Sequence, residues 1–244
     1  MGTTIATARA RARAEVRAEI VTEARRQLAV EGAPALSLRS VTRQLGMASS
    51  AVYRYFPSRD ELLTALIVEA YDGLGAVAET AAAAGGQAFE RWRTVCRAIR
   101  GWALENPHEY ALIFGSPVPG YEAPALTVGP ASRVTLVLAG LLVDAHRAGE
   151  LTDVDAGPLS RAMSVEALRL ADLALPDVPL ATVAGGLVAW TSLFGQISFE
   201  LFGQLKGIVE QPEVLFEHAI IVTAGLLGLR PGQLPGPVAA QTEP

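Results

Sequence analysis

Four polar side chains near the start of the chain carry the clearest chemistry in this sequence. Ser49, Ser50, Tyr53 and Arg54 occupy the outer side of one short helical pattern. Hydroxyl and guanidinium groups donate hydrogen bonds to phosphate oxygens, and an arginine can also bind the edge of a guanine base. These residue types therefore indicate non-covalent recognition of a polyanion.

A short helix ending at a glycine is predicted just before these side chains. Leu38, Val41 and Leu45 recur at spacings of three and four, so they form one apolar stripe. Ser37 precedes the stripe as a candidate N-cap. Gly46 follows it, where a left-handed C-cap favours a residue without a Cβ atom. The chain is expected to turn at this glycine.

The second helical pattern, residues 49–55, carries the polar side chains. It leaves Ala51, Val52 and Phe56 for an inward face. The two patterns together form a candidate helix-turn-helix. A structural helical hairpin has the same stripe and the same glycine, so the spacing alone does not separate the two interpretations.

The residues after the hairpin favour the helix-turn-helix. Pro57 cannot continue a helix. Ser58 and Glu61 then form a capping box, with Ser58 at the N-cap and Glu61 at the third helical position. A long helix is predicted to begin there, with apolar residues at helical spacing: Leu62, Leu63, Leu66, Ile67, Ala70, Tyr71 and Leu74.

Residues 13–74 resemble the DNA-binding domain of the TetR family of transcriptional regulators. The resemblance rests on the helix-turn-helix, the run YRYF, the proline and the capped long helix, in that order. It implies a homodimeric, ligand-responsive regulator, most simply a repressor of a palindromic double-stranded DNA operator. The residues expected to contact DNA are Ser37, Arg39, Ser49, Ser50, Tyr53, Arg54, Tyr55 and Arg59.

One position departs from the family pattern. Ala48 stands where family members usually carry serine or threonine at the N-cap of the recognition helix. A missing cap costs roughly 1 kcal/mol. Either Ser49 caps a helix that starts one residue later, or this helix end frays until DNA orders it.

Charge is divided unevenly along the chain. Residues 1–60 hold ten arginines and five acidic residues, whereas residues 61–244 hold ten basic and twenty acidic residues. The basic part is the part with the motif, which favours attraction of DNA to this end only. Charged residues on solvated helix faces are the competing explanation.

A basic arm is predicted at residues 1–12, before an amphipathic helix over residues 14–31. Arg9, Arg11 and Arg13 alternate with alanines, which suits contact with the DNA backbone or simple solvation. A targeting peptide is the alternative. No apolar segment of sufficient length follows, and Glu15 and Glu19 come at once, so export is not expected.

No residue set indicates catalysis. Cys96 is the single cysteine and lies in a helical pattern, so a core position in a reducing cytoplasm is expected. His108, His146 and His218 are isolated. Phosphate-loop, zinc-ligand and nucleophile-elbow motifs do not occur, so we expect no enzyme, no cofactor and no metal. An enzyme or carrier with an incidental hairpin remains the alternative.

Residues 178–199 contain no charged side chain, and a stretch of this length can span a bilayer. No positive cluster flanks them, and polar residues interrupt them. The amphipathic helix predicted at residues 213–229 also needs a partner surface. A dimer interface of two such helices per subunit is therefore favoured over a membrane-anchored regulator. Its expected residues are Val188, Trp190, Phe194, Leu201, Leu215 and Ile221.

Helices are also predicted near residues 89–106, 108–114, 130–148 and 159–175. Residues 106–124 and 189–205 resemble the regulatory domain of a TetR subgroup named for a Trp-His-Gly signature, although Phe194 replaces the histidine. A small, largely apolar effector is expected between these helices and the long helix after the motif. The candidate ligand residues are Trp92, Arg97, Trp102, Tyr110, Phe114, Met163, Glu166 and Arg169.

The predicted fold is all-α. An arm (1–12) and a three-helix helix-turn-helix DNA-binding domain (13–58) precede a larger helical ligand-binding and dimerisation domain (59–229). A disordered tail is expected at residues 230–244, which are rich in proline and glycine.

Overall fold

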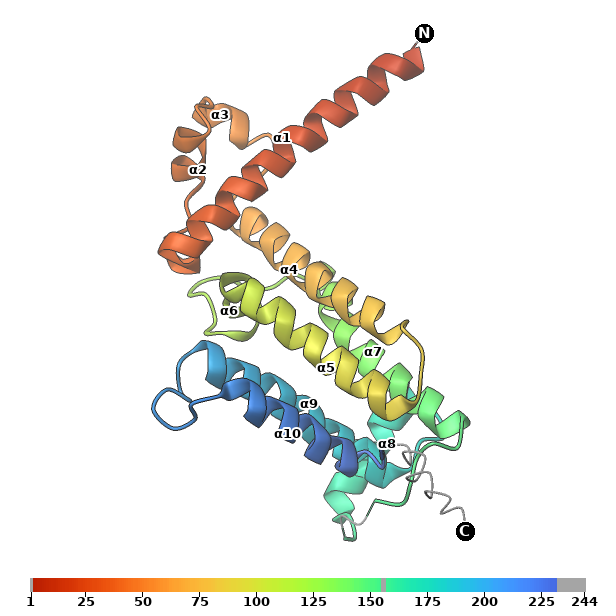
Figure 1. Cartoon of the computed structure of the whole chain (residues 1–244). Coiled ribbons are helices and arrows are strands. Elements are labelled where there is room, and N and C mark those ends of the chain that lie inside the picture. Colours follow the sequence, from red (N-terminus) through yellow and green to blue (C-terminus); the bar gives the residue numbers. More distant parts are fainter. Residues whose placement is uncertain (1, 155–156, 232–244) are drawn as a thin grey trace, which may run out of the picture. The chain divides into compact units, whose positions relative to one another are not determined.

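The computed structural model describes residues 2–154 and 157–231, and every regular element within them is helical (Figure 1). The predicted all-α class is therefore confirmed. In chain order the helices are α1 (Gly2–Glu31), η1 (Ala33–Ala35), α2 (Leu38–Gln44), α3 (Ser49–Val52), α4 (Arg59–Ala82), α5 (Ala88–Glu105), α6 (Pro107–Phe114), η2 (Ala125–Thr127), α7 (Val128–Arg147), α8 (Arg161–Ala174), α9 (Leu180–Leu201) and α10 (Pro212–Leu226).

Two helix lengths differ from the prediction. Helix α1 begins at Gly2 rather than at Ala14, because alanine and arginine are strong helix formers; the expected arm is thus the first part of this helix. Helix α3 ends at Val52, and residues 53–55 form turns. The tail expected to be disordered lies, from residue 232 onward, outside the described residues.

The chain divides into two compact units. The first contains residues up to 76 together with residues 101–133, and the second contains residues 77–100 together with those from 134 onward. Helices α4, α5 and α7 each supply residues to both units. This division differs from the predicted boundary between residues 58 and 59. That boundary was drawn between DNA binding and ligand binding, and it remains a prediction.

The core of the first unit lies between α1, α2, α3 and the start of α4. Val52 and Phe56, which bracket the recognition turn (residues 53–55), are buried there together with Val41 of α2. The other buried members are Ile20, Val21, Ala24, Leu36, Leu38, Leu62, Leu63, Ala65, Leu66 and Ile67. The apolar stripes predicted for the hairpin and the long helix therefore meet in one core.

An ion cluster joins three helices of the first unit. The Arg25 side chain of α1 lies 2.9 Å from a Glu69 carboxylate oxygen of α4 and also contacts Glu109 of α6. Nearby, the hydroxyls of Thr64 and Tyr121 form a hydrogen bond of 2.9 Å. Such partly exposed contacts contribute modestly to stability and mainly fix the positions of helices.

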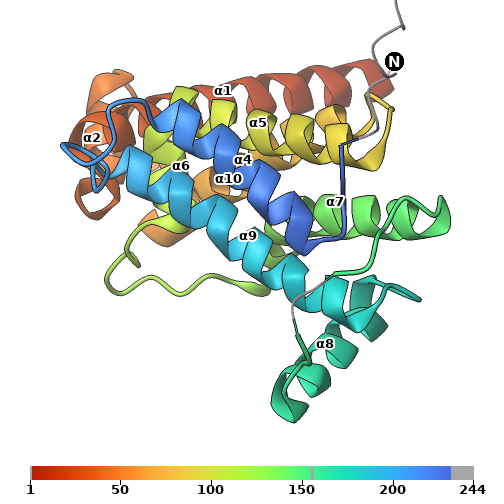
Figure 2. The same ribbon diagram turned by 60° about the horizontal axis from the view of Figure 1, so that its bottom comes forward.

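Helices α9 and α10 of the second unit lie side by side (Figure 2). Gly185 lets their backbones approach closely, because a Cβ atom at this position would overlap the Leu226 carbonyl oxygen. Helix α8 packs on α9 through a small cluster that includes Ala167 and Val183. The charge-free segment of the sequence is therefore a packed helix, with buried residues on its inner side.

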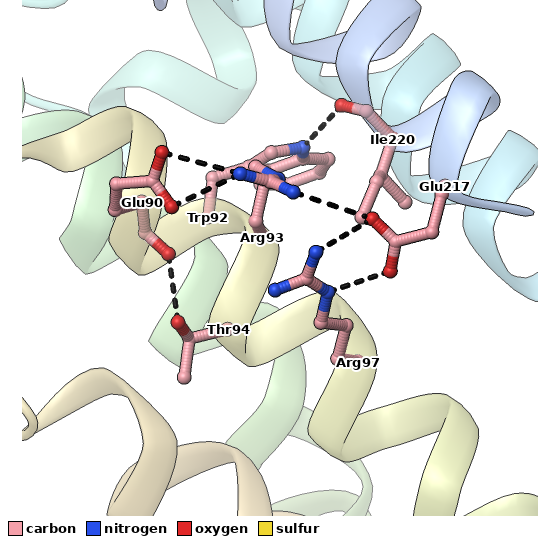
Figure 3. Close-up of polar contacts among 7 residues, drawn as sticks. All are labelled: Glu90, Trp92, Arg93, Thr94, Arg97, Glu217 and Ile220. Atoms are coloured by element: carbon pink, nitrogen blue, oxygen red, sulfur yellow. Dashed lines mark hydrogen bonds and ion pairs between the residues drawn. The ribbon is translucent and has the colours of Figure 1, made fainter. Parts of the chain in front are cut away.

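Charged side chains fasten α5 to α10 within the second unit (Figure 3). Arg97 donates two hydrogen bonds to Glu217, of 2.6 and 2.7 Å, and Arg93 also contacts Glu217 at 3.5 Å. The hydrogen bond from Arg97 lowers the pKa of Glu217. Beside this cluster, the indole N–H of Trp92 donates to the Ile220 carbonyl at 2.9 Å. Trp92 therefore links α5 directly to the α10 backbone.

Within the part of the chain that the structure describes, two helical segments are long and apolar enough, by length and composition alone, to cross a membrane. They are Ala125–Arg147 and Leu180–Leu201. The core helix of a soluble protein passes the same test, and α9 packs against both α8 and α10.

We expect Gly46→Ala to lower the free energy of unfolding by about 1 to 2 kcal/mol, because its φ of 64° is costly for a residue with a Cβ atom. No atom lies within 4 Å of that Cβ, so backbone strain is the only cost. Gly140→Ala in α7 is the matched control and should gain roughly 0.5 to 1 kcal/mol. Urea unfolding measures both, and an unchanged midpoint for Gly46→Ala would contradict the left-handed turn.

Candidate nucleic-acid interface

The turn between α2 and α3 is closed by backbone hydrogen bonds. The Met47 N–H donates to the Thr42 carbonyl at 3.0 Å, and the Gly46 N–H donates to the Arg43 carbonyl at 3.3 Å. With Gly46 in the left-handed region, this is a Schellman arrangement. The predicted glycine C-cap is confirmed, and it sets the direction in which α3 leaves α2.

Helix α3 starts without a side-chain cap. Ala48 occupies the N-cap with φ −64° and ψ 136°, and its carbonyl accepts from the Ala51 N–H at 2.8 Å. The helix begins at Ser49 with Ala48 at its N-cap, so the alternative in which Ser49 caps a helix that starts one residue later is wrong. Ser37 has the predicted N-cap position on α2, but its side chain makes no capping bond.

The recognition turn is held from inside the unit. The N–H groups of Tyr55 and Phe56 both donate to the Val52 carbonyl, at 2.9 and 3.0 Å. Val52 is 0% exposed and Phe56 is 2% exposed. Helix α3 has only four residues, so these two buried side chains and not helix propensity keep it in place.

The outer side of this region carries unpaired donors. Ser50, Tyr53 and Arg54 are exposed, as is Arg39 on α2. None of these four side chains makes a hydrogen bond or ion pair within the part of the chain that the structure describes. The predicted outward face of the second helical pattern is thus confirmed for Ser50, Tyr53 and Arg54, while contact of the four side chains with DNA remains a prediction.

Arg43 is a further candidate that the sequence prediction omitted. It is exposed and lies four residues after Arg39, so both share one face of α2. Helical spacing from Arg39 would have identified it. The only hydrogen bond of its side chain within the described residues is a long one, 3.4 Å, to the Ser40 hydroxyl.

Two arginines of α1 support the recognition turn from the side. The Arg13 guanidinium donates to the Arg54 carbonyl at 3.2 Å and lies 5.7 Å from the centre of the Tyr55 ring. The Arg17 guanidinium lies 4.9 Å from the centre of the Phe56 ring. These cation–π contacts join residues about forty positions apart, so local sequence patterns do not reveal them.

The guanidinium of Arg59 donates hydrogen bonds to backbone carbonyls of the protein itself. It donates to the carbonyls of Leu36 at 3.0 Å, Ala33 at 2.9 Å and Pro34 at 3.3 Å. Its side chain therefore fixes the connection from α1 to α2. Next to it, the Glu61 N–H donates to the Ser58 hydroxyl at 3.1 Å, as the capping box predicts.

Groups suited to covalent chemistry are buried or isolated. Cys96 is fully buried, and burial raises its pKa well above the usual value, so its thiolate is disfavoured. The expected core position of Cys96 is confirmed. Among the described residues, no three His, Cys, Asp or Glu side chains gather as metal ligands.

The predicted ligand residues do not share one pocket. Trp92 lines an apolar cavity of about 370 Å³ in the second unit, and none of the other seven does. Met163 packs on the α8–α9 cluster, Arg97 binds Glu217, and exposed Glu166 and Arg169 pair with each other at 3.5 Å. Trp102, Tyr110 and Phe114 belong to the first unit, where the Tyr110 and Phe114 rings lie 4.9 Å apart.

The predicted interface residues differ in exposure. Val188, Trp190 and Ile221 are 54%, 38% and 44% exposed. Leu201 and Leu215 are half-buried. Phe194 is buried, with its ring 5.9 Å from that of Trp190, so in this structure it supports the exposed tryptophan.

Comparison with known proteins matches both ends of the chain to one family. Residues 20–66 match the model of bacterial regulatory proteins of the tetR family, and residues 92–222 match a tetracyclin repressor-like C-terminal domain. An HTH-type transcriptional regulator of Mycobacterium tuberculosis (strain ATCC 25618 / H37Rv) is 41% identical over 210 residues, covering 81% of this chain and 86% of the relative.

Solved structures share the fold. The crystal structure of the regulatory protein SCO4313 has a TM-score of 0.73 and 36% identity, covering 88% of this chain and 98% of that one. The TetR family transcriptional regulator PfmR from Thermus thermophilus has a TM-score of 0.56 and 21% identity, covering 87% and 99%. The second likeness concerns the fold alone.

Arg54→Ala should reduce the preference for cognate over scrambled DNA. An arginine bound to guanine supplies about 1 to 3 kcal/mol of discrimination, and Arg54 is exposed and unpaired within the described residues. Arg39→Ala and Tyr53→Phe are the comparisons, and they should weaken binding to both DNAs alike. Binding curves on the two duplexes decide it: an unchanged ratio in Arg54→Ala would remove this residue from base recognition.

Proposed function

We propose that this chain, which belongs to the TetR family of DNA-binding transcriptional regulators, is a cytoplasmic repressor released from a palindromic operator by a small apolar effector. The observation that carries the proposal is the set of unpaired donors, among the described residues, on the outer side of α2, α3 and the recognition turn, held by buried Val52 and Phe56. A rigidly held row of donors is suited to the DNA major groove.

The family assignment bears on the two alternatives. The helix-turn-helix belongs to a matched DNA-binding domain and is not an incidental hairpin. A membrane anchor would use α9, but α9 is packed against α8 and α10. The proposed output is a change of DNA affinity, for which no covalent chemistry, cofactor or metal is needed.

A homodimer is proposed through α9 and α10. Both helices carry large apolar side chains exposed in the single chain, including Val188 and Phe199 on α9 and Val214, Ile221 and Val222 on α10. Several large apolar side chains exposed on two neighbouring helices are typical of an interface. A two-fold axis would place the same pair of helices from each subunit in one four-helix bundle.

The proposed effector site is the cavity of the second unit that Trp92 lines. Its volume of about 370 Å³ lies within the range of ligand pockets, roughly 300 to 1,000 Å³. The polar side-chain groups of its lining are the Thr135 hydroxyl and the indole N–H groups of Trp92 and Trp190, and that of Trp92 is already bonded to the Ile220 carbonyl. A compact, neutral molecule with one hydrogen-bonding group would suit these walls.

The cavity and the proposed interface share α9. Gly186, Leu187 and Trp190 line the cavity, while Val188 between them is exposed. A ligand that favours one position of α9 would therefore favour one dimer geometry. By linkage, it would lower operator affinity by its differential binding free energy for the two geometries.

We also assign the C-terminal domain to the Trp-His-Gly subgroup. Trp190 and Gly195 of α9 keep two residues of that signature, and this helix lies within the matched C-terminal domain. Phe194 is buried where the signature has histidine, so no imidazole chemistry is carried over.

Ile221→Asp should produce a folded monomer that binds operator DNA poorly. Ile221 is 44% exposed in the single chain, so the protomer tolerates the charge, whereas burying it unpaired in an interface is strongly unfavourable. Leu173→Asp on α8, where the side chain is 73% exposed, is the control and should stay dimeric. Sedimentation measures the dimer dissociation constant. If Ile221→Asp dimerises with the same constant as wild type, the proposed interface is wrong.

A small alcohol, 1-decanol, should bind the cavity and shift tryptophan emission in the Trp102→Phe variant. That variant keeps Trp92 and Trp190, which both line the cavity. Ala139→Leu fills the cavity and should weaken decanol binding markedly, whereas neighbouring Gly140→Ala, which does not line it, should not. Release of operator DNA by decanol with no effect of Ala139→Leu would place the effector site elsewhere.

A further inference from the structure

The first part of α1 carries an arginine stripe directed towards the recognition turn. Arg9, Arg13 and Arg17 recur every four residues, so they lie along one face of the helix. Contacts fix the direction of this face, because the guanidinium of Arg13 lies over Tyr55 and that of Arg17 over Phe56. Both aromatic residues belong to or directly follow the recognition turn.

Arg9 lies one helical turn beyond the last of these contacts. Four residues of α-helix span about 6 Å, so Arg9 extends past Arg13 in the direction that leads away from Arg17 and Phe56. Its side chain is exposed and makes no hydrogen bond or ion pair within the described part of the chain. Arg11, also exposed, lies about 160° around the helix from Arg9.

This part of α1 lacks protein support. Residues 8–12 are exposed on every side, and a helix without tertiary packing is only marginally stable in water. The first 14 residues contain three arginines and no acidic residue. A polyanion beside the stripe would neutralise its charge and stabilise the helix.

We propose that Arg9 binds a DNA phosphate at the edge of each half-site, next to the bases that the recognition turn contacts. The inference rests on the proposed operator binding, because the recognition turn brings DNA to this side of α1. Arg13 is a positioning residue here: its bond to the Arg54 carbonyl holds α1 against the turn at 3.2 Å. The helix thereby widens the DNA footprint without adding sequence discrimination.

The test compares Arg9→Ala with Arg11→Ala in the full chain, through the salt dependence of binding to operator and scrambled duplexes. Each phosphate contact contributes about 0.9 to the slope of log affinity against log salt, so two Arg9 contacts per dimer contribute about 1.8. Wild-type protein should therefore lose about tenfold more affinity than Arg9→Ala between roughly 50 and 200 mM salt. The Arg11→Ala slope should equal that of wild type.

Three further readings make the test decisive. Arg9→Lys should restore the slope, and all variants should unfold at the same temperature because neither arginine contacts the core. If Arg9→Ala and Arg11→Ala lower the salt slope equally, the arginines act only through their general positive charge. If neither lowers it, the arginine stripe is simply solvated. Either result overturns the proposal. If wild type shows no preference for the operator, the proposed function is wrong. The salt slopes on scrambled DNA would still test whether Arg9 binds a phosphate.

Discussion

Burial of Val52 and Phe56 is the constraint on which the DNA-binding surface depends. Helix α3 has four residues and no side-chain cap, so it cannot be stable by itself. Its position is set by the core beneath it, by the left-handed Gly46 before it and by Arg13 and Arg17 of α1 beside it. Arg59 fixes the chain that leads into α2. Exposed Tyr53 and Arg54 are thus presented by contacts from three separate parts of the sequence.

The second unit shows the same division between an inner side that packs and an outer side that remains exposed. Gly185 lets α9 and α10 approach closely, and the bonds from Arg97 and Trp92 attach α10 to α5. These contacts leave an apolar outer surface for the proposed dimer and an apolar cavity for the proposed effector. Since both use α9, occupancy of one can alter the other without any charged group changing state.

Sequence patterns predicted the elements that depend on local chemistry. The stop at Gly46, the Ser58 N-cap and the inward faces of α2 and α4 follow from residue type and helical spacing, and the structure confirms them. Contacts between residues far apart in the sequence could not be predicted from those local patterns. Arg59 was predicted to contact DNA, yet three backbone carbonyls surround its guanidinium. The ligand residues were predicted from their aromatic or polar type. Most of them are buried in other contacts or form ion pairs, and of the eight only Trp92 lines the cavity.

Selection of bound sequences from a random DNA pool tests the central claim most directly. A two-fold dimer with one recognition turn per subunit should enrich an inverted repeat, with half-site centres about 34 to 36 Å apart or a multiple of that spacing. Addition of a saturating cavity ligand should abolish the enrichment. Recovery of a single half-site, or of no preferred sequence, from the folded full-length protein would contradict the account.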